Sequence, residues 1–534
     1  MIESISVKNY KAFKEASFDI KPITVFLGEN SVGKTSILQL LMLLKQTASI
    51  SLFNDNTPLK MYGYYAKMGK VENLFHNKRT DVPIELSIHF SSEKLGESLA
   101  ALWDNYIVSM TSIGYFFPVR SLIEWKNVHG SEKITRSSFA EYIKLVEGVM
   151  SNEKIEKFKQ NLDYTVSRNN LLAAVDLQNF SEKNFMLIYD LLSSVKEKVK
   201  KEQSFIVSYT LGYTHQKFAI QQFCLRAGDS ILLSIKGEGE ELSVSSSLTR
   251  VSEAAAKAIS NCFWRNNPLF DCFAYPYRVD SEKNQTTMSN YLLKMVELVI
   301  KEFREQFTYT KMNHVGPLRA SPKRYYVLDK ESYTTYLDCS DGEALVEILK
   351  NRSYVKDKAN KWLSSFGFNV SVEESEDVIH HLMVTQNARD YDISDVGFGV
   401  SQILPIIVQS FLAPDNSLNI VEQPEIHLHP RMQANLANLF SDVVSSKKKR
   451  MVIETHSEYF LRRLRRLMAD SEFKGLSPED VSIYYFEPMD IGNGKDYVSA
   501  QQIEISNKGA FDLPQSLYET EVEDNIEFMK LQAK

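Results

Sequence analysis

The sequence has 534 residues, of which 43% are hydrophobic and 24% are charged, and its formal net charge is −6. This composition is ordinary for a soluble globular protein with a sizeable core that needs no disulfides, and the length predicts two to four domains. The net negative charge provides no overall attraction to nucleic acid or to an anionic membrane, so either kind of binding would require a local basic patch.

The N-terminus and the cysteines bear on where the protein works. Residues 1–8 begin at once with strand-like alternation, and the chain has no unbroken apolar run of about 18 residues. We therefore expect a cytoplasmic protein without a membrane span. The cysteines lack the paired spacing of a zinc site and are typical of reduced thiols. They are Cys224, Cys262, Cys272 and Cys339.

The first strong motif follows strands predicted at residues 2–7, 18–20 and 23–27. Gly28, four further residues and Gly33-Lys34-Thr35 then lead into a helical run. In such a phosphate-binding loop the backbone N–H groups surround the phosphates, the lysine reaches the β and γ phosphates, and the threonine hydroxyl holds Mg²⁺. The sequence therefore predicts binding of a nucleoside triphosphate. The expected contacts are Gly28, Asn30, Gly33, Lys34, Thr35 and Ser36.

The character of the chain changes between about residues 95 and 310. Helical spacing occurs at 153–163, 185–202 and 291–307, and short strands are predicted at 205–211 and 231–235. None of these helical stretches sustains a heptad repeat over several turns, so a long coiled-coil arm is not predicted. We interpret this range as an insertion.

A turn rich in proline and cations follows the insertion, at residues 314–326. Its cations are Arg319, Lys323 and Arg324. They could bind a phosphate of a nucleotide or of nucleic acid, or they could position a loop of the active site.

Three further motifs lie near the C-terminus. A glycine-rich turn with Gly397, Gly399 and Ser401 opens a helix, a geometry suited to an anion. An apolar strand at 418–421 ends in Glu422-Gln423-Pro-Glu425, where a carboxylate can hold Mg²⁺ through water. A second strand at 450–454 ends in Thr-His456-Ser, and that histidine can hydrogen-bond a γ-phosphate.

Two other groups of residues have competing interpretations. His427 and His429 lie near Glu425 and could bind a metal, but no further ligands are evident. The four arginines at 462, 463, 465 and 466 could face DNA or could form an ordinary solvated helix face.

Taken in order, these motifs resemble the ATPase heads of the ABC class, in the branch that contains SMC, Rad and RecF proteins and the OLD nucleases. The resemblance implies an α/β fold, an ABC-type P-loop NTPase head with a mixed sheet flanked by helices and a largely helical α+β insertion. The head would occupy residues 1–95 and 311–534, and the insertion residues 96–310 would serve partner binding or specificity. The phrases at 421–430, 454–457 and 315–319 more closely resemble the ATPase subunits of Septu anti-phage systems, which also occur with retrons.

The resemblance implies roles for individual residues. ATP would lie between the phosphate loop of one subunit and the glycine-rich signature of another, with Mg²⁺ held by Thr35 and Glu422 and His456 acting as the switch histidine. The signature departs from the family pattern because Gly397 stands where a serine is usual, which leaves Ser401 to supply a hydroxyl. Gln423 replaces the catalytic glutamate, so hydrolysis should be slow unless Glu425 substitutes.

The resemblance also implies partners. We expect an ATP-binding subunit that forms a homodimer or higher oligomer and controls a separate nuclease, of the HNH type if it is Septu-like. A retron-associated complex would add a reverse transcriptase and a noncoding nucleic acid. Only about 75 residues follow His456, too few for the Toprim domain of an OLD nuclease. Two alternatives are a RecF-like repair ATPase that acts directly on DNA and a scaffold in which ATP is structural.

Overall fold

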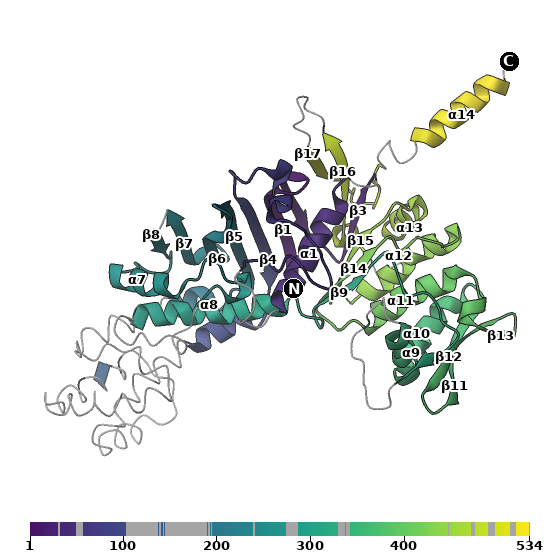
Figure 1. Ribbon diagram of the computed structural model, residues 1–534, viewed down its shortest axis with the longest axis horizontal. Helices are drawn as coiled ribbons and strands as arrows, with labels where there is room; N and C mark the ends of the chain where they lie inside the picture. Colours follow the sequence, from purple (N-terminus) through teal and green to yellow (C-terminus); the bar gives the residue numbers. More distant parts are fainter. Residues whose placement is uncertain are drawn as a thin grey trace. The chain divides into compact units, whose positions relative to one another are not determined.

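The computed structural model describes residues 1–29, 32–49, 57–102, 195–238, 241–273, 287–328, 342–446, 448–470, 476–489, 497–512 and 519–532, together with a few single positions. The helix expected at 153–163 lies outside these residues. The chain forms two compact units (Figure 1). The first comprises Met1–Ser49, Met61–Arg79 and Glu305–Lys534, and the second comprises Ile50–Lys60 and Thr80–Arg304.

A six-stranded sheet forms the centre of the first unit, with the strand order β17-β16-β3-β15-β14-β9. The strands from β16 to β9 are parallel, and β17 pairs with β16 in the antiparallel sense. Their bounds are β3 Ile23–Gly28, β9 Met312–Val315, β14 Ser417–Glu422, β15 Lys449–Glu454, β16 Val481–Met489 and β17 Tyr497–Gln502. Because β3 has a neighbour on each side and is buried along its whole length, its residues are mostly apolar, and Thr24 is its one hydroxyl residue.

Helices of the first unit supply much of its core. These are α1 Lys34–Ala48, α11 Phe398–Leu412, α12 Pro430–Val444 and α13 Glu458–Ala469. Apolar side chains of α11, α12 and α13 share one buried cluster with β3, β14 and β15, and Figure 1 shows these three helices beside the sheet. In α1 the residues from Leu40 to Leu44 are all buried, so this helix is enclosed on more than one face.

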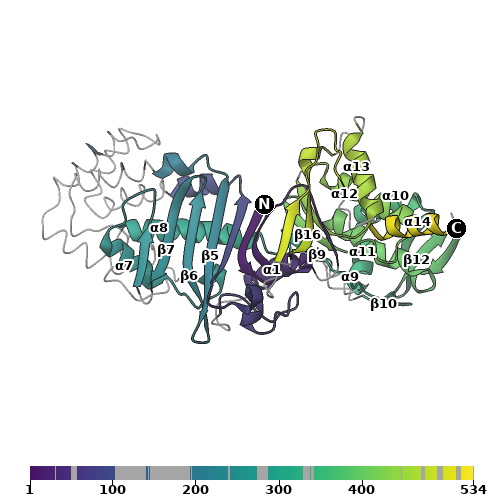
Figure 2. The same cartoon turned by 90° about the horizontal axis from the view of Figure 1, so that it is seen from above.

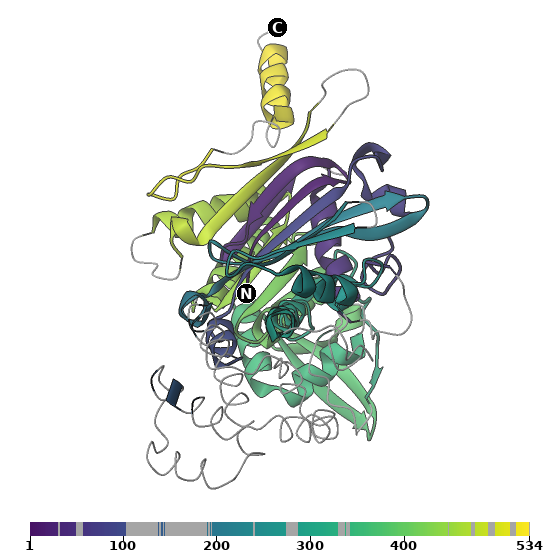
Figure 3. The same ribbon diagram turned by 90° about the vertical axis from the view of Figure 1, so that its left-hand side faces the viewer.

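The N-terminal hairpin lies against the far end of the chain. It consists of β1 Ile2–Tyr10 and β2 Phe13–Asp19 in antiparallel register. The rings of Phe18 and Phe486 stack with centroids 5.7 Å apart, and Tyr484 accepts the backbone N–H of Asp19 at 2.6 Å. Both aromatic partners belong to β16, which runs beside β17 in Figure 3.

A smaller sheet completes the first unit. Its strands are β10 Tyr326–Val327, β11 Phe368–Glu376, β12 Ile379–Gln386 and β13 Arg389–Asp392, and the adjoining helices are α9 Gly342–Asn351 and α10 Ser353–Ser364. Val370 of β11 and Leu382 of β12 enter the same buried cluster as α11. The helix that follows the glycine-rich turn is therefore packed against this smaller sheet.

The described part of the second unit contains more strand than the sequence predicts. An antiparallel sheet runs in the order β4-β5-β6-β7-β8, and α8 lies across it (Figure 2), with the rings of Phe303 and Phe90 5.5 Å apart. The elements are β4 Ile84–Ser91, β5 Ser204–Thr214, β6 Lys217–Ala227, β7 Ser230–Glu238, β8 Glu241–Ser245, α7 Glu253–Cys262 and α8 Thr287–Glu305. An irregularity in the pairing of β5 with β6 interrupts the alternation of β6, which explains why this strand was not predicted.

The remaining elements are short or exposed. The 3₁₀ turns are Val71–Leu74, His76–Lys78, Leu269–Asp271, Ile393–Asp395 and Pro478–Asp480. The described side chains of the last helix, α14 Glu519–Gln532, are exposed. Among the helices of the described ranges, none combines the length and the apolar character needed to cross a membrane.

Candidate nucleotide-binding site

The phosphate-binding loop connects β3 to α1. Gly28 and Gly33 have φ angles of 139° and 105°, in the region that favours glycine. A Cβ atom on Gly28 would lie 2.5 Å from the carbonyl oxygen of Phe486, and one on Gly33 would lie 2.9 Å from Cβ of Ala12. Both glycines are therefore required by space as well as by conformation. Asn30 lies outside the described residues.

Lys34 is the first residue of α1 and is only 2% exposed. Its Nζ donates to the carbonyl oxygen of Gly28 at 2.8 Å and to that of Glu29. Burial lowers the pKa of Lys34, and the nearby carboxylates of Glu454 and Glu425 oppose that shift. The ammonium group thus lies within the loop, at the place from which it can reach phosphate oxygens. The next residue, Thr35, is exposed. The backbone N–H of Ser36 donates to the carbonyl oxygen of Gly33 at 2.9 Å.

Two glutamates end neighbouring strands at the same edge of the sheet. Glu422 ends β14 and Glu454 ends β15, and the two residues are partners in the parallel register. Glu454 in turn pairs with Phe26 of β3, the strand that leads into the phosphate loop. Because the carboxyl ends of parallel strands meet at one edge, the two acids lie beside Lys34 and Thr35.

The two glutamates differ in their partners. His314 of β9 donates from Nε2 to Oε1 of Glu422 at 2.6 Å. Glu454 is 4% exposed and accepts the side-chain hydroxyl of Thr35, while its Oε2 has no hydrogen-bond partner within the described part of the chain. Burial and the neighbouring Glu422 raise the pKa of Glu454 to about 7.

The loop after β14 is held by several hydrogen bonds. Gln423 has a φ of 42°, and its backbone N–H donates to the carbonyl oxygen of Glu454 at 2.8 Å. Arg319 is 7% exposed and donates to the carbonyl oxygens of Glu422 and Gln423 at 2.9 and 3.1 Å. Of the two roles considered for Arg319, the structure therefore supports the positioning of this loop.

Glu425 connects this loop to the end of β15. Its Oε2 accepts the hydroxyl of Thr455 at 2.8 Å, and its Oε1 accepts the backbone N–H of His456 at 2.7 Å. Burial raises the pKa of Glu425, and these hydrogen bonds oppose the shift. Both oxygens are engaged, so Glu425 is poorly placed to act as a free proton acceptor.

His456 lies between the end of β15 and α13. Its Nε2 is buried and has no hydrogen-bond partner among the described residues. Burial and the charge of Lys34 lower the pKa of His456, which favours a neutral imidazole. A neutral ring with an unused nitrogen can form a hydrogen bond with a phosphate oxygen.

The three predicted residues of the glycine-rich turn lie in different surroundings. Gly397 caps α11, and within the described residues nothing lies within 4 Å of a Cβ built on it. Gly399 lies close to the loop after β14, since its Cβ would be 3.3 Å from the carbonyl oxygen of His427. Ser401, by contrast, is 5% exposed and lines a small internal cavity with Tyr326.

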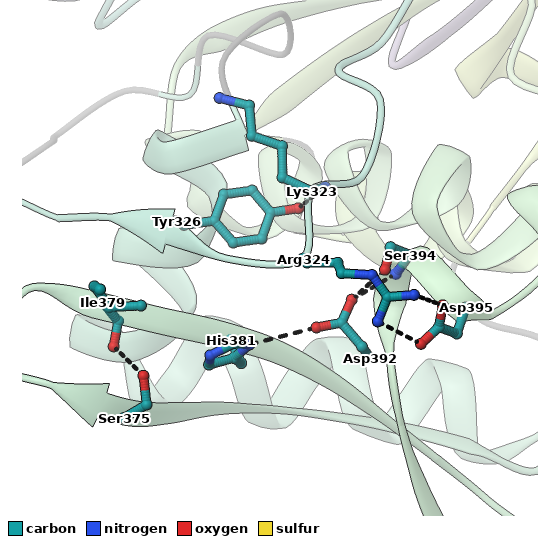
Figure 4. A network of polar contacts seen from close by, with 9 residues as sticks. All are labelled: Lys323, Arg324, Tyr326, Ser375, Ile379, His381, Asp392, Ser394 and Asp395. Carbon is teal, nitrogen blue, oxygen red and sulfur yellow. Dashed lines mark hydrogen bonds and ion pairs between the residues drawn. The ribbon is translucent and has the colours of Figure 1, made fainter.

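The other cations of the proline-rich turn have local partners. The guanidinium of Arg324 forms two hydrogen bonds with the carboxylate of Asp395, at 2.7 and 3.2 Å (Figure 4). Lys323 donates from its backbone N–H to the hydroxyl of Tyr326 and from Nζ to Glu343. Asp395 directly precedes the glycine-rich turn, so Arg324 helps to hold that turn.

The structure also shows contacts of the histidine pair after β14 and of the arginines on α13, the two groups of residues that have competing interpretations. His429 caps α12 by accepting the backbone N–H of Arg431 at 3.2 Å. No group of three or more His, Cys, Asp or Glu side chains within the described ranges could hold a metal ion without further ligands. Arg462 pairs with Glu458, and Arg463 donates to Asn438 at 2.7 Å.

Sequence reasoning missed two residues of the site. His314 reaches Glu422 only because β9 pairs with β14, which the sequence does not reveal. Glu454 could have been found, because it ends its strand as Glu422 does and precedes the Thr-His pair.

A family model described as AAA ATPase domain (AAA_15) matches residues 1–461. The chain belongs to this family. An AAA ATPase domain is a nucleotide-binding domain, and together with the parallel sheet and the loop after β3 this match confirms the predicted P-loop ATPase fold of mixed α/β structure.

Curated relatives of this AAA ATPase domain include DNA replication and repair proteins RecF. The protein from Lysinibacillus sphaericus (strain C3-41) is 31% identical over 94 residues, which are 17% of this chain and 24% of the relative. The one from Enterococcus faecalis (strain ATCC 700802 / V583) is 27% identical over 94 residues, with the same shares. The chain thus spans about a quarter of the length of these relatives.

Similar solved structures include the SMC head domain from Thermotoga maritima, with 9% identity, coverage of 94% of this chain and 98% of that one, and a TM-score of 0.31. Another is the Smc head with an extended coiled coil bound to the C-terminal domain of ScpA from Pyrococcus furiosus. It has 9% identity, covers 100% of this chain and 99% of that one, and gives a TM-score of 0.32.

Proposed function

We propose that this chain binds ATP with Mg²⁺ at the phosphate loop and that bound ATP joins two copies into a slowly hydrolysing clamp, which controls a separate nuclease in an anti-phage complex. The observation that carries the proposal is the arrangement at one sheet edge. There Lys34 and Thr35 lie beside Glu454, and Glu422 is the register partner of Glu454. The resemblance assigns the position of the catalytic base to Gln423, which follows Glu422.

The residues have distinct roles in this proposal. Lys34 would move from the loop carbonyls to the β and γ phosphates, because charged phosphate oxygens are stronger acceptors than carbonyl groups. Thr35 and Glu422 would hold Mg²⁺, the glutamate through water. His456 would hydrogen-bond the γ-phosphate through its buried Nε2.

Slow hydrolysis follows from the chemistry of position 423. A glutamine can orient the attacking water but cannot accept its proton, which reduces the rate on the order of 10² to 10⁴ relative to a carboxylate. Glu425 cannot easily compensate, because both its oxygens bind the end of β15. ATP would therefore act mainly by remaining bound, and it can hold one conformation only if it binds that conformation better than the other.

The open N-terminus of α11 supports assembly across two copies. Gly397 provides no side-chain cap for the first backbone N–H groups of the helix, and such groups bind anions. We propose that this end contacts the γ-phosphate held by the other copy. The buried Ser401 would support the turn from inside instead of supplying a hydroxyl to the partner.

Control of a nuclease and the anti-phage role rest on sequence phrases. The stretches at 421–430, 454–457 and 315–319 resemble Septu ATPase subunits, and all three contribute residues to the site. The partner would be an HNH-type nuclease, joined by a reverse transcriptase and a noncoding nucleic acid in a retron-associated complex.

The test is ATP turnover by the purified chain beside K34A and Q423E, with bound nucleotide and oligomer mass recorded on the same samples. The proposal expects slow turnover, retained ATP and an ATP-dependent increase in mass, all lost in K34A. It also expects faster turnover in Q423E. Brisk turnover by the wild type would contradict the clamp. Retained nucleotide without turnover in either protein would favour structural ATP.

A RecF-like ATPase that acts directly on DNA is the second candidate. The short match to RecF proteins favours it, and so do Arg465 and Arg466, which are exposed on α13 and form no ion pair within the described part of the chain. DNA binding should then weaken steeply with salt, with a slope reduced by neutralising these two arginines. Binding unchanged in the double variant Arg465→Gln/Arg466→Gln would exclude this patch.

A further inference from the structure

The carboxylate of Glu454 has an acceptor position without a partner. Glu454 is 4% exposed, and its carboxylate accepts a hydrogen bond from the hydroxyl of Thr35. Its Oε2 makes no hydrogen bond to any described residue. Buried carboxylate oxygens are almost always paired, because leaving one without a partner is costly. This oxygen therefore points to a ligand that binds at the phosphate loop.

The charges around Glu454 indicate the sign of that ligand. Glu422 and Glu425 both lie within electrostatic range of Glu454, and Lys34 is the cation beside Glu454. The other two carboxylates have partners, since His314 binds Glu422 and the end of β15 binds Glu425. ATP would bring further negative charge to this edge. The excess of negative charge is relieved by a cation with a preference for oxygen ligands.

The geometry selects magnesium bound together with nucleotide. Mg²⁺ is usually held by one or two carboxylates, a hydroxyl, water and phosphate oxygens, without a complete protein cage. This matches the described residues, which include no group of three or more acidic, histidine or cysteine side chains able to bind a metal without help. Thr35 can contact both Glu454 and a cation. Its hydroxyl donates to Glu454, and a lone pair of the same oxygen stays available to the cation.

We propose that Glu454 is the second acidic residue of the magnesium site, beside Glu422, and that it makes nucleotide binding depend on Mg²⁺. The inference rests on the proposed function, since it requires ATP at the phosphate loop. With Mg²⁺ present, Glu454 orients Thr35 and takes part in the coordination sphere, directly or through water. Without Mg²⁺, the same carboxylate repels the phosphates.

The experiment measures binding of N-methylanthraniloyl-ATP by fluorescence anisotropy, in EDTA and in a titration of MgCl₂, and counts bound Mn²⁺ by electron paramagnetic resonance. The proteins are the wild type, E454Q, K34A and, as the matched control, E347Q. Glu347 is another buried glutamate of the first unit, on α9. Circular dichroism and thermal melting establish that each variant is folded.

The expected result for E454Q has two parts. The half-saturating concentration of Mg²⁺ or Mn²⁺ rises about tenfold or more, as for other residues that orient metal ligands. Binding in EDTA is as tight as in the wild type or tighter, because one negative charge has been removed. E347Q should match the wild type in both measurements. Should E454Q fail to fold, E454D keeps the charge on a shorter side chain and should still weaken metal binding.

Different outcomes overturn the role of Glu454 and the proposed binding of ATP. A folded E454Q or E454D with the metal dependence of the wild type overturns the role of Glu454 while leaving ATP binding intact. A wild-type chain that binds no nucleotide in either condition overturns the proposed function itself. K34A, which should lose binding in both conditions, identifies the phosphate loop as the site that is measured.

Discussion

Glu425 and Thr455 are joined by a hydrogen bond of 2.8 Å that ties the loop after β14 to the end of β15. The second oxygen of Glu425 accepts the backbone N–H of His456, so one buried carboxylate fixes the residue that would sense the γ-phosphate. A change in the position of the β14 loop would therefore move His456 as well.

The pH dependence of stability should reveal this carboxylate. Burial raises the pKa of Glu425 above its ordinary value of 4.5. A carboxyl group with a higher pKa in the folded chain stabilises it fully below the unfolded pKa, and that stability is lost as pH rises through the folded pKa. The free energy of unfolding of the wild type, relative to E425Q, should thus fall as pH rises from 4.5 towards neutrality. Urea unfolding at several pH values measures this difference, and parallel curves would refute it.

Gln423→Glu should increase ATP turnover by at least about tenfold, because a carboxylate can accept the proton of the attacking water. The two side chains have nearly the same shape, so the strained backbone at this position is unchanged. Gln423→Leu is the matched control, since it keeps the size but can neither orient water nor accept a proton. Its turnover should fall below that of the wild type in a phosphate-release assay. Equal rates for all three proteins would show that position 423 does not contact the water.

Arg319→Ala should lower the free energy of unfolding by about 2–4 kcal/mol, because the carbonyl oxygens of Glu422 and Gln423 would lose buried, charged donors. It should also weaken ATP binding by disordering the loop. Arg324→Ala provides the comparison, since it removes an exposed ion pair worth about 0–1 kcal/mol (Figure 4). Guanidinium chloride unfolding measures both, and similar values for the two variants would contradict the positioning role of Arg319.

Two glycine substitutions should separate folding from assembly. Gly33→Ala should destabilise the fold by about 1–3 kcal/mol and abolish nucleotide binding, since it combines a φ of 105° with a contact at 2.9 Å. In Gly397→Ala the new Cβ would have no described atom within 4 Å, and the φ of −53° suits alanine. The free energy of unfolding should therefore change by no more than about 0.5 kcal/mol. The substitution should nevertheless weaken ATP-dependent dimerisation, measured by mass photometry. An ATP-dependent dimer that forms equally well in this variant would remove the α11 terminus from the interface.

Local signals predicted the parts of the site that lie on single segments. The phosphate loop, the strand before Glu422 and the strand before His456 each carry an apolar run and a terminal motif, and all three strands are present. His314 and Arg319 act through pairing of β9 with β14 and through burial, neither of which is written in their immediate sequence. Ser401, to which the resemblance assigns a hydroxyl contact with a partner, is buried on α11 and lines a small pocket with Tyr326.

The second unit was harder to predict for a related reason. The strands β5 and β7 were predicted, but β6 contains an irregularity where Gln221 lies between paired residues, and β8 is short and partly exposed. A sheet of this kind is specified by pairing between strands, which short windows of sequence do not contain.

The position of β3 has a consequence for the synthesis of the protein. This strand is made among the first residues, yet its two neighbours in the sheet are Lys449–Glu454 and Val481–Met489, and Gly28 is shaped by the carbonyl group of Phe486. The ribosome must therefore translate Val481–Met489 before β3 can pair with both of its neighbours and the phosphate loop can take its final shape. A nascent chain that lacks β16 therefore has an incomplete phosphate loop, and any assembly through that loop begins only after β16 has been made.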